Sequence, residues 1–101
     1  QLGTEKTLLD SLLVEIERLV AIELEITTFM SNNSTVLSLS TSTVQVIDKT
    51  IVEQALAEYD LLSIDAQSRL HSEKVLIDSL LIEIGRQEGI INDITYFMKT
   101  Y

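Results

Sequence analysis

The chain has 101 residues, which is enough for a single small domain, and nearly half of them (46%) are hydrophobic, mostly Leu, Ile and Val. It contains no cysteine, which excludes a disulfide scaffold, a thiolate zinc site and a thiol enzyme. The formal charge is −9 and the seven basic residues are scattered singly, so binding to nucleic acid or to an anionic membrane surface is not expected. No uncharged apolar run approaches the roughly 20 residues that span a bilayer, so no transmembrane segment is predicted.

The first predicted element is a long amphipathic helix over residues 4–31. Apolar residues at steps of three and four form a stripe that we expect to face the core: Leu8, Leu12, Ile16, Leu19, Ile22, Ile26 and Phe29. A second stripe lies beside it, formed by Leu9, Leu13, Val20 and Leu24. One small bundle is not expected to cover both stripes, so the second is predicted to be an interaction surface.

A polar loop is predicted over residues 32–42, because Ser, Thr and Asn side chains compete there for backbone hydrogen bonds. Leu37 and Leu39 alternate with serines, which would also suit a short strand. Since a lone strand has no visible partner, we prefer an ordered loop whose leucines fold back on the helices. Asn32 and Asn33 each begin a glycosylation sequon and the chain starts at Gln1, which together favour a secreted or extracellular protein.

A second amphipathic helix is predicted over residues 43–70, with Ser42 and Gln45 at capping-box spacing. Neither Gly nor Pro marks its end. Either a tight turn at residues 68–72 ends it, or one helix continues from residue 43 to residue 100. We favour the turn, because a new copy of the first helix begins at Glu73.

The third predicted helix, over residues 73–100, repeats the first. Residues 5–33 and 73–101 align at a constant offset of 68 positions, and 15 of the 29 aligned residues are identical. The chain therefore holds about one and a half helical-hairpin repeats, either as a complete domain or as part of a longer array. Gly85 and Gly89 are interpreted as a local weakening of this helix, with close helix packing as the alternative.

These elements predict an all-α fold with a single domain over residues 1–101. Three helices of similar length would form an up-down-up bundle in which the first and third are pseudo-repeats and lie parallel. Glu23 falls near the apolar stripe of the first helix, and an antiparallel second helix would bring Lys49 to it as a partner.

No group of residues predicts catalysis, a cofactor or a metal site. His71 is the lone histidine and lacks the spacing of a metal-binding bundle, and most carboxylates belong to solvated helix faces. We therefore expect a protein that is not an enzyme.

Two functional hypotheses follow. The favoured one is a non-catalytic helical interaction or structural module, which forms a homo-oligomer or docks on another protein through Leu9, Leu13, Val20 and Leu24. The alternative is a carrier of fatty acids or similar apolar small molecules. Its cavity between helices would be lined by Phe29, Met30, Tyr59, Tyr96, Phe97 and Met98.

Overall fold

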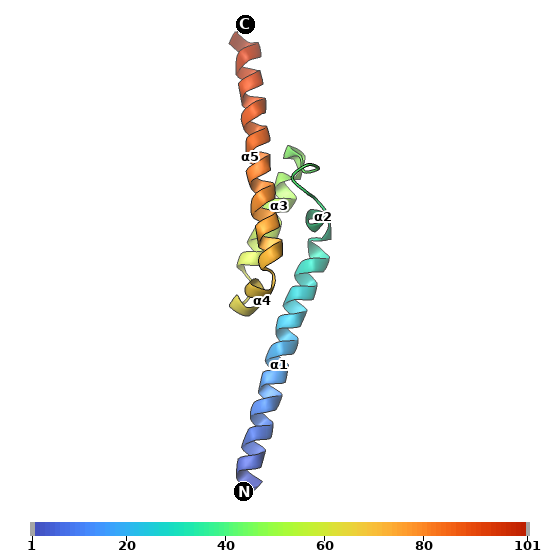
Figure 1. Cartoon of the computed structure of the whole chain (residues 1–101), viewed down its shortest axis with the longest axis vertical. Helices are drawn as coiled ribbons and strands as arrows, with labels where there is room; N and C mark the ends of the chain where they lie inside the picture. The colour runs from blue at the N-terminus through green and yellow to red at the C-terminus, as the bar shows by residue number, and fades with distance from the viewer. Residues whose placement is uncertain (1, 101) are drawn as a thin grey trace.

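A computed structural model describes residues 2–100 of the chain. This part is helical and contains no β-strand, which confirms the all-α prediction (Figure 1). The elements are α1 (Leu2–Asn32), α2 (Ser34–Leu37), the 3-10 helix η1 (Val46–Asp48), α3 (Lys49–Asp60), α4 (Ile64–Arg69) and α5 (His71–Thr100).

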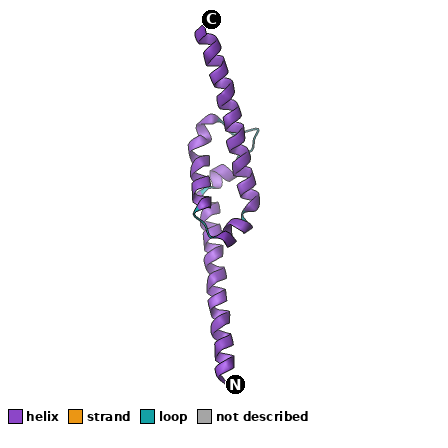
Figure 2. Cartoon of the chain, turned by 90° about the vertical axis from the view of Figure 1, so that its left-hand side faces the viewer, coloured by secondary structure: helices purple, strands orange, loops and turns teal. Residues whose placement is uncertain are grey.

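The molecule is a thin rod. Its extents are 86 × 18 × 16 Å and its radius of gyration is 21.2 Å, whereas a compact domain of this length has a radius of gyration of about 13 Å. Figures 1 and 2 show α1 and α5 leaving a short central body in opposite directions, with the termini at opposite ends of the rod. The long helices overlap over only part of their lengths, so the predicted bundle of three side-by-side helices does not describe this chain.

We call residues 34–70 the connector, and its longest helix, α3, runs antiparallel to the first half of α5. Near the start of α3, Lys49 Nζ lies 3.0 Å from the Glu88 carboxylate. Near its end, the Tyr59 ring lies beneath Lys74 Nζ, 5.8 Å from the ring centroid. Helix α3 thus covers roughly residues 74–88 of α5.

The end of α3 and the start of α4 also lie against the second half of α1. The Glu58 carboxylate accepts hydrogen bonds from the side-chain amides of Asn32 and Asn33, at 3.0 and 2.8 Å. Further back along α1, the Glu25 carboxylate accepts from Ser63. The connector therefore joins the second half of one copy of the repeat to the first half of the other.

The predicted helix over residues 43–70 is wrong in its continuity, because it is divided into η1, α3 and α4. Ser63 has extended backbone angles (φ −62°, ψ 157°), and its hydroxyl accepts from the Ala66 N–H as the N-cap of α4. The predicted Ser42 cap does not form either; the Asp48 carboxylate instead accepts from the Gln45 N–H at 2.9 Å. The predicted turn is present at Leu70, between α4 and α5, so the single helix from 43 to 100 is wrong.

The predicted polar loop begins with the short helix α2, which follows α1 almost directly. Leu37 and Leu39 are partly buried against the core, so the prediction that they fold back is confirmed and the strand alternative is wrong.

The hydrophobic core lies entirely in the central body. Its buried residues come from α1, the connector and the first half of α5: Phe29, Val36, Val44, Val52, Ala55, Leu70, Ile77, Leu80 and Ile84. The predicted core stripe of the first helix is wrong over its first half, since Leu8, Leu12 and Ile16 are exposed.

One finer prediction and one alternative interpretation also need correction. Glu23 is exposed, and Lys49 pairs with Glu88 instead. A Cβ atom added at Gly85 or Gly89 would meet no atom within 4 Å, so these glycines do not serve close helix packing.

Candidate functional site

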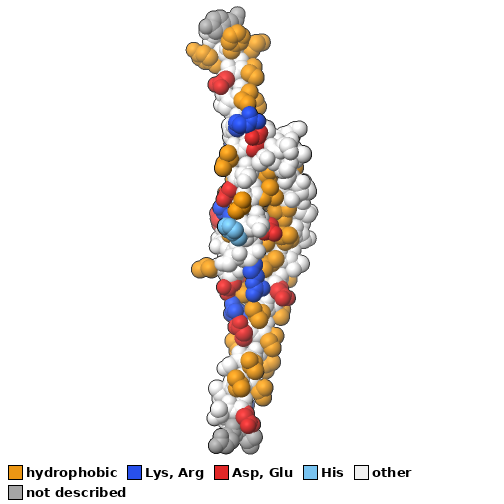
Figure 3. Space-filling model, viewed as in Figure 1, with side chains coloured by type: hydrophobic (Ala, Val, Ile, Leu, Met, Phe, Trp, Pro, Cys, Tyr) orange, Lys and Arg blue, Asp and Glu red, His pale blue; other side chains and the backbone are white. Residues whose placement is uncertain are grey.

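Two helical arms project from the central body. We call residues 2–17 of α1 the N arm and residues 89–100 of α5 the C arm. Figure 3 shows hydrophobic side chains along both ends of the rod. On the N arm, large apolar residues are between 50% and 66% exposed: Leu8, Leu9, Leu12, Leu13, Val14 and Ile16. Monomeric soluble proteins rarely expose contiguous apolar surface on this scale, so the arms are the strongest candidate for a binding surface.

The residues predicted to form an interaction surface are all exposed. Leu9 and Leu13 lie on the N arm, while Val20 and Leu24 lie further along α1. The residues that sequence reasoning missed are Leu8, Leu12 and Ile16. Their periodicity marked them as apolar-face residues, and nothing in that periodicity showed that this part of the helix would lie outside the body.

The internal repeat shows how the bare residues of the N arm would look when covered. The buried residues of α5 are Ile77, Leu80 and Ile84, and at the offset of 68 positions they match three residues of the N arm: Leu9, Leu12 and Ile16. Leu80 and Ile84 are 0% and 1% exposed, whereas the identical residues Leu12 and Ile16 are 50% and 55% exposed. The same sequence pattern is therefore core in one copy and surface in the other.

The relation is reversed at the C arm. Ile22 and Phe29 of α1 are buried, whereas their counterparts Ile90 and Phe97 are 43% and 60% exposed. The covered halves are the second half of α1 and the first half of α5, and together they contain every position of one repeat. The two exposed arms together contain the same positions a second time. We name the N-arm face (Leu8, Leu9, Leu12, Leu13 and Ile16) and the C-arm face (Ile90, Ile94 and Phe97) on this basis.

The repeat predicts a difference in hydrogen exchange between matching segments. Amides of residues 5–17 are expected to exchange much faster than those of residues 73–85 in dilute solution. The sequences are similar, but residues 5–17 lack the tertiary contacts that supply most of the stability of a helix in a protein. Exchange mass spectrometry on peptic fragments measures this directly, and equal protection in the two segments would contradict the exposed N arm.

The two copies also carry the same ion pair. Arg18 pairs with Glu15 at 2.6 Å, and Arg86 pairs with Glu83 at 2.7 Å. Hydrogen bonds from Arg86 and Gln87 lower the pKa of Glu83 to about 2. Arg18 also binds Asp65 and so ties the end of the N arm to α4.

The second half of α1 is anchored by Glu25. Its carboxylate accepts hydrogen bonds from the Ser63 hydroxyl at 2.6 Å and from the Ser63 N–H at 2.9 Å. These bonds lower the pKa of Glu25 below its ordinary value of 4.5. The contact connects α1 to the residue that caps α4.

This anchor predicts a pH-dependent difference between the wild type and Glu25→Gln. A lowered carboxyl pKa contributes stability that is complete above the unfolded-state pKa and is lost as the pH falls through the folded-state pKa. The wild type should therefore have the higher Tm at about pH 6, and the gap should narrow as the pH falls below the ordinary pKa of 4.5. Thermal unfolding followed by circular dichroism checks this, and a gap that does not change with pH would contradict it.

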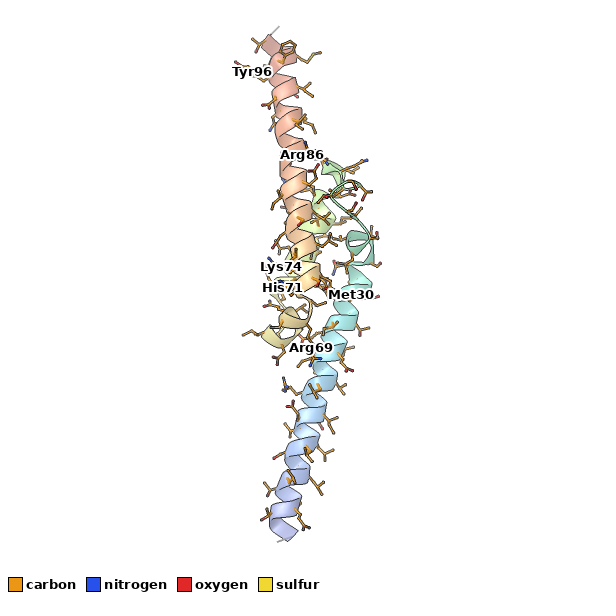
Figure 4. The ribbon with its side chains drawn as sticks, in the orientation of Figure 1. Met30, Arg69, His71, Lys74, Arg86 and Tyr96 are labelled. Atoms are coloured by element: carbon orange, nitrogen blue, oxygen red, sulfur yellow. The ribbon has the colours of Figure 1, made fainter. Side chains whose placement is uncertain are left out.

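The residues predicted to line a ligand cavity do not lie together. Phe29 is buried and packs edge-on against Tyr59, with ring centroids 6.3 Å apart. Met30 borders an open hollow of about 250 Å³ between α1, α2 and the start of α5. Tyr96 lies near the tip of the C arm with Phe97 and Met98, far from Met30 (Figure 4). Pockets for small molecules usually measure about 300–1,000 Å³ and enclose the ligand.

Four further observations concern residues 2–100. No group of three or more potential metal-ligating side chains comes together in this range, and His71 begins α5 in an exposed position (Figure 4). The Asn33 side chain is 6% exposed and donates to both the Phe29 carbonyl and Glu58, so a glycan there would disrupt the body. No helix within the described range is both long and apolar enough to cross a membrane.

Comparisons of the chain with protein-family models, with curated proteins and with solved structures give no match.

Proposed function

We propose that this chain is a non-catalytic helical interaction module that self-associates or docks on another protein through its arms. The observation that carries the proposal is the exposed N-arm face, whose matching residues in α5 are buried or partly buried under the connector. A surface that forms a core in one copy has the shape and apolarity to be covered in the other.

The energetics support a covered state. Fully burying a large aliphatic side chain contributes about 1.5–3 kcal/mol. The five residues of the N-arm face are 50–60% exposed, so covering them would contribute part of that amount at each position. Covering would also stabilise the helix itself, since a helical arm without tertiary contacts is marginal. The net charge of −9 opposes contact between copies at low ionic strength, and salt would screen that repulsion.

Sedimentation velocity over a range of protein and salt concentrations tests self-association. We expect the fraction of oligomer to increase with protein and salt concentration. The double variant Leu12→Lys, Ile16→Lys should be a folded monomer under the same conditions. The matched control is Val14→Lys. Val14 is an exposed apolar residue of the same arm, but its counterpart Ile82 stays 74% exposed in the covered copy. An oligomer that persists unchanged in the double variant, or a wild type that is monomeric throughout, would overturn self-association through the arms.

The carrier hypothesis receives no specific support from the described residues. Its six proposed lining residues are divided between the core, one open hollow and the C arm. Stoichiometric lipid in an organic extract of the purified protein would be needed to revive it.

A further inference from the structure

Resting on the proposed function, we infer that the N-arm face docks one kind of partner: an amphipathic helix that resembles α3 and runs antiparallel to α1. The partner would lie on the N arm as α3 lies on α5. Docking in this way fixes the direction of the partner helix relative to α1 and its register on the N arm.

The apolar contacts of α3 define what the partner presents. Val52 and Ala55 of α3 are fully buried in one cluster with Ile77, Leu80 and Ile84 of α5. Partly buried residues flank them: Ile51, Leu56 and Tyr59. The N arm carries Leu9, Leu12 and Ile16 at the matching positions, so of these three buried residues only Ile77 is replaced, by Leu9.

Polar groups beside the apolar face are repeated as well. Lys74 forms an ion pair with Asp78 at 2.7 Å and lies over the ring of Tyr59. The N arm has Lys6 and Asp10 at the same positions. It therefore offers a cation where the end of an α3-like helix would place an aromatic ring.

One difference distinguishes the expected partner from α3 itself. Lys49 of α3 pairs with Glu88, and Gln87 donates to the Val44 carbonyl. The matching residues of α1 are Val20 and Leu19, which offer neither an acid nor an amide. The partner therefore has an apolar residue in place of Lys49, since a lysine there would lose its ion pair and face Val20.

The docking face also has a defined boundary. Ile82 is 74% exposed although it lies on the covered half of α5, so its counterpart Val14 falls outside the contact. A binder that merely favoured apolar surface would use Val14 as readily as Leu12. A partner in the α3 register would not.

The test uses the full chain and a synthetic peptide of residues 42–62 as the probe, with hydrogen exchange as the readout. At a peptide concentration of about 100 times Kd, exchange of amides in residues 5–17 should slow by about 100-fold, because binding to the helical arm opposes its opening. A peptide that carries Lys49→Met should bind with a several-fold lower Kd. Hydrogen-exchange protection of residues 74–88 should be the same with and without peptide. This distinguishes binding to the N arm from displacement of the chain's own connector.

Two variants decide whether the contact has the inferred register. Leu12→Lys, Ile16→Lys should abolish peptide-induced protection, whereas Val14→Lys should retain it. Absence of protection in the wild type, or equal loss in both variants, would overturn the inference.

A different result separates the inference from the proposed function. If residues 5–17 become protected as the concentration of the chain alone rises, while the peptide neither binds nor dissociates the oligomer, the occupant is a second copy of the chain. That outcome overturns the α3-like partner and leaves the interaction module standing. If the arm is protected neither by the peptide nor by concentration and the chain stays monomeric, both the inference and self-association fail.

Discussion

Phe29→Ala is expected to lower the free energy of unfolding by about 3–5 kcal/mol, while Phe97→Ala should leave it nearly unchanged. The two phenylalanines occupy the same position in the two copies of the repeat. Phe29 is 0% exposed, belongs to the core and packs edge-on against Tyr59. Removing its ring leaves a cavity among Tyr59 and the surrounding core residues, whereas Phe97 is 60% exposed on the C arm.

Urea unfolding followed by circular dichroism measures both variants against the wild type. In a chain this size, each kcal/mol shifts Tm by about 4–8 °C, so Phe29→Ala should also be evident in a thermal scan. Measurements belong at a concentration where the wild type is monomeric, since association through the C arm would stabilise the wild type relative to Phe97→Ala. Similar losses in both variants under those conditions would contradict the staggered arrangement of the two copies.

Leu80→Lys is expected to abolish cooperative folding, whereas Leu12→Lys should give a folded chain. Leu80 is fully buried in the core, and a lysine there would have to bury its ammonium group or lose its proton. Either cost is comparable with the total stability of a small domain. Leu12 stands at the matching position with half its surface in water, so a lysine there keeps its charge solvated.

Circular dichroism and thermal scans at neutral pH distinguish the two outcomes. Leu80→Lys should lose the cooperative transition that Leu12→Lys keeps. A cooperative transition in Leu80→Lys near the wild-type Tm would show that the position is not buried as described.

Sequence reasoning could predict the apolar character of the candidate site but not its exposure. The stripe through Leu8, Leu12 and Ile16 has the spacing of a core face, and its copy in α5 is one. Periodicity is a property of a single helix and does not record what lies against it. The surface predicted from the second stripe therefore included Leu9 and Leu13 but left out the other three residues of the N-arm face.

The division of the connector was hidden by a similar ambiguity. Leu62 and Ala66 continue the apolar period of α3, which favoured one unbroken helix. Helix α3 ends at Asp60, and a new helix starts after Ser63, whose hydroxyl caps α4 and donates to Glu25 of α1. The contact with Glu25 is tertiary, since the two residues are 38 positions apart in the sequence.

The sequence by itself determined that the chain is all-α, that its first and last helices are copies, and that a turn separates the connector from α5. Only the tertiary structure decided how far the two copies are offset from each other along the long axis of the molecule. At 1.5 Å per residue, an unbroken helix over residues 43–70 would be about 42 Å long. It would therefore run back along nearly the full length of α1. The 12 residues of α3 run back only about 18 Å along this direction before the chain turns at Ser63 and again at Leu70. Helix α5 therefore begins beside the second half of α1, and half of each copy is left outside the core.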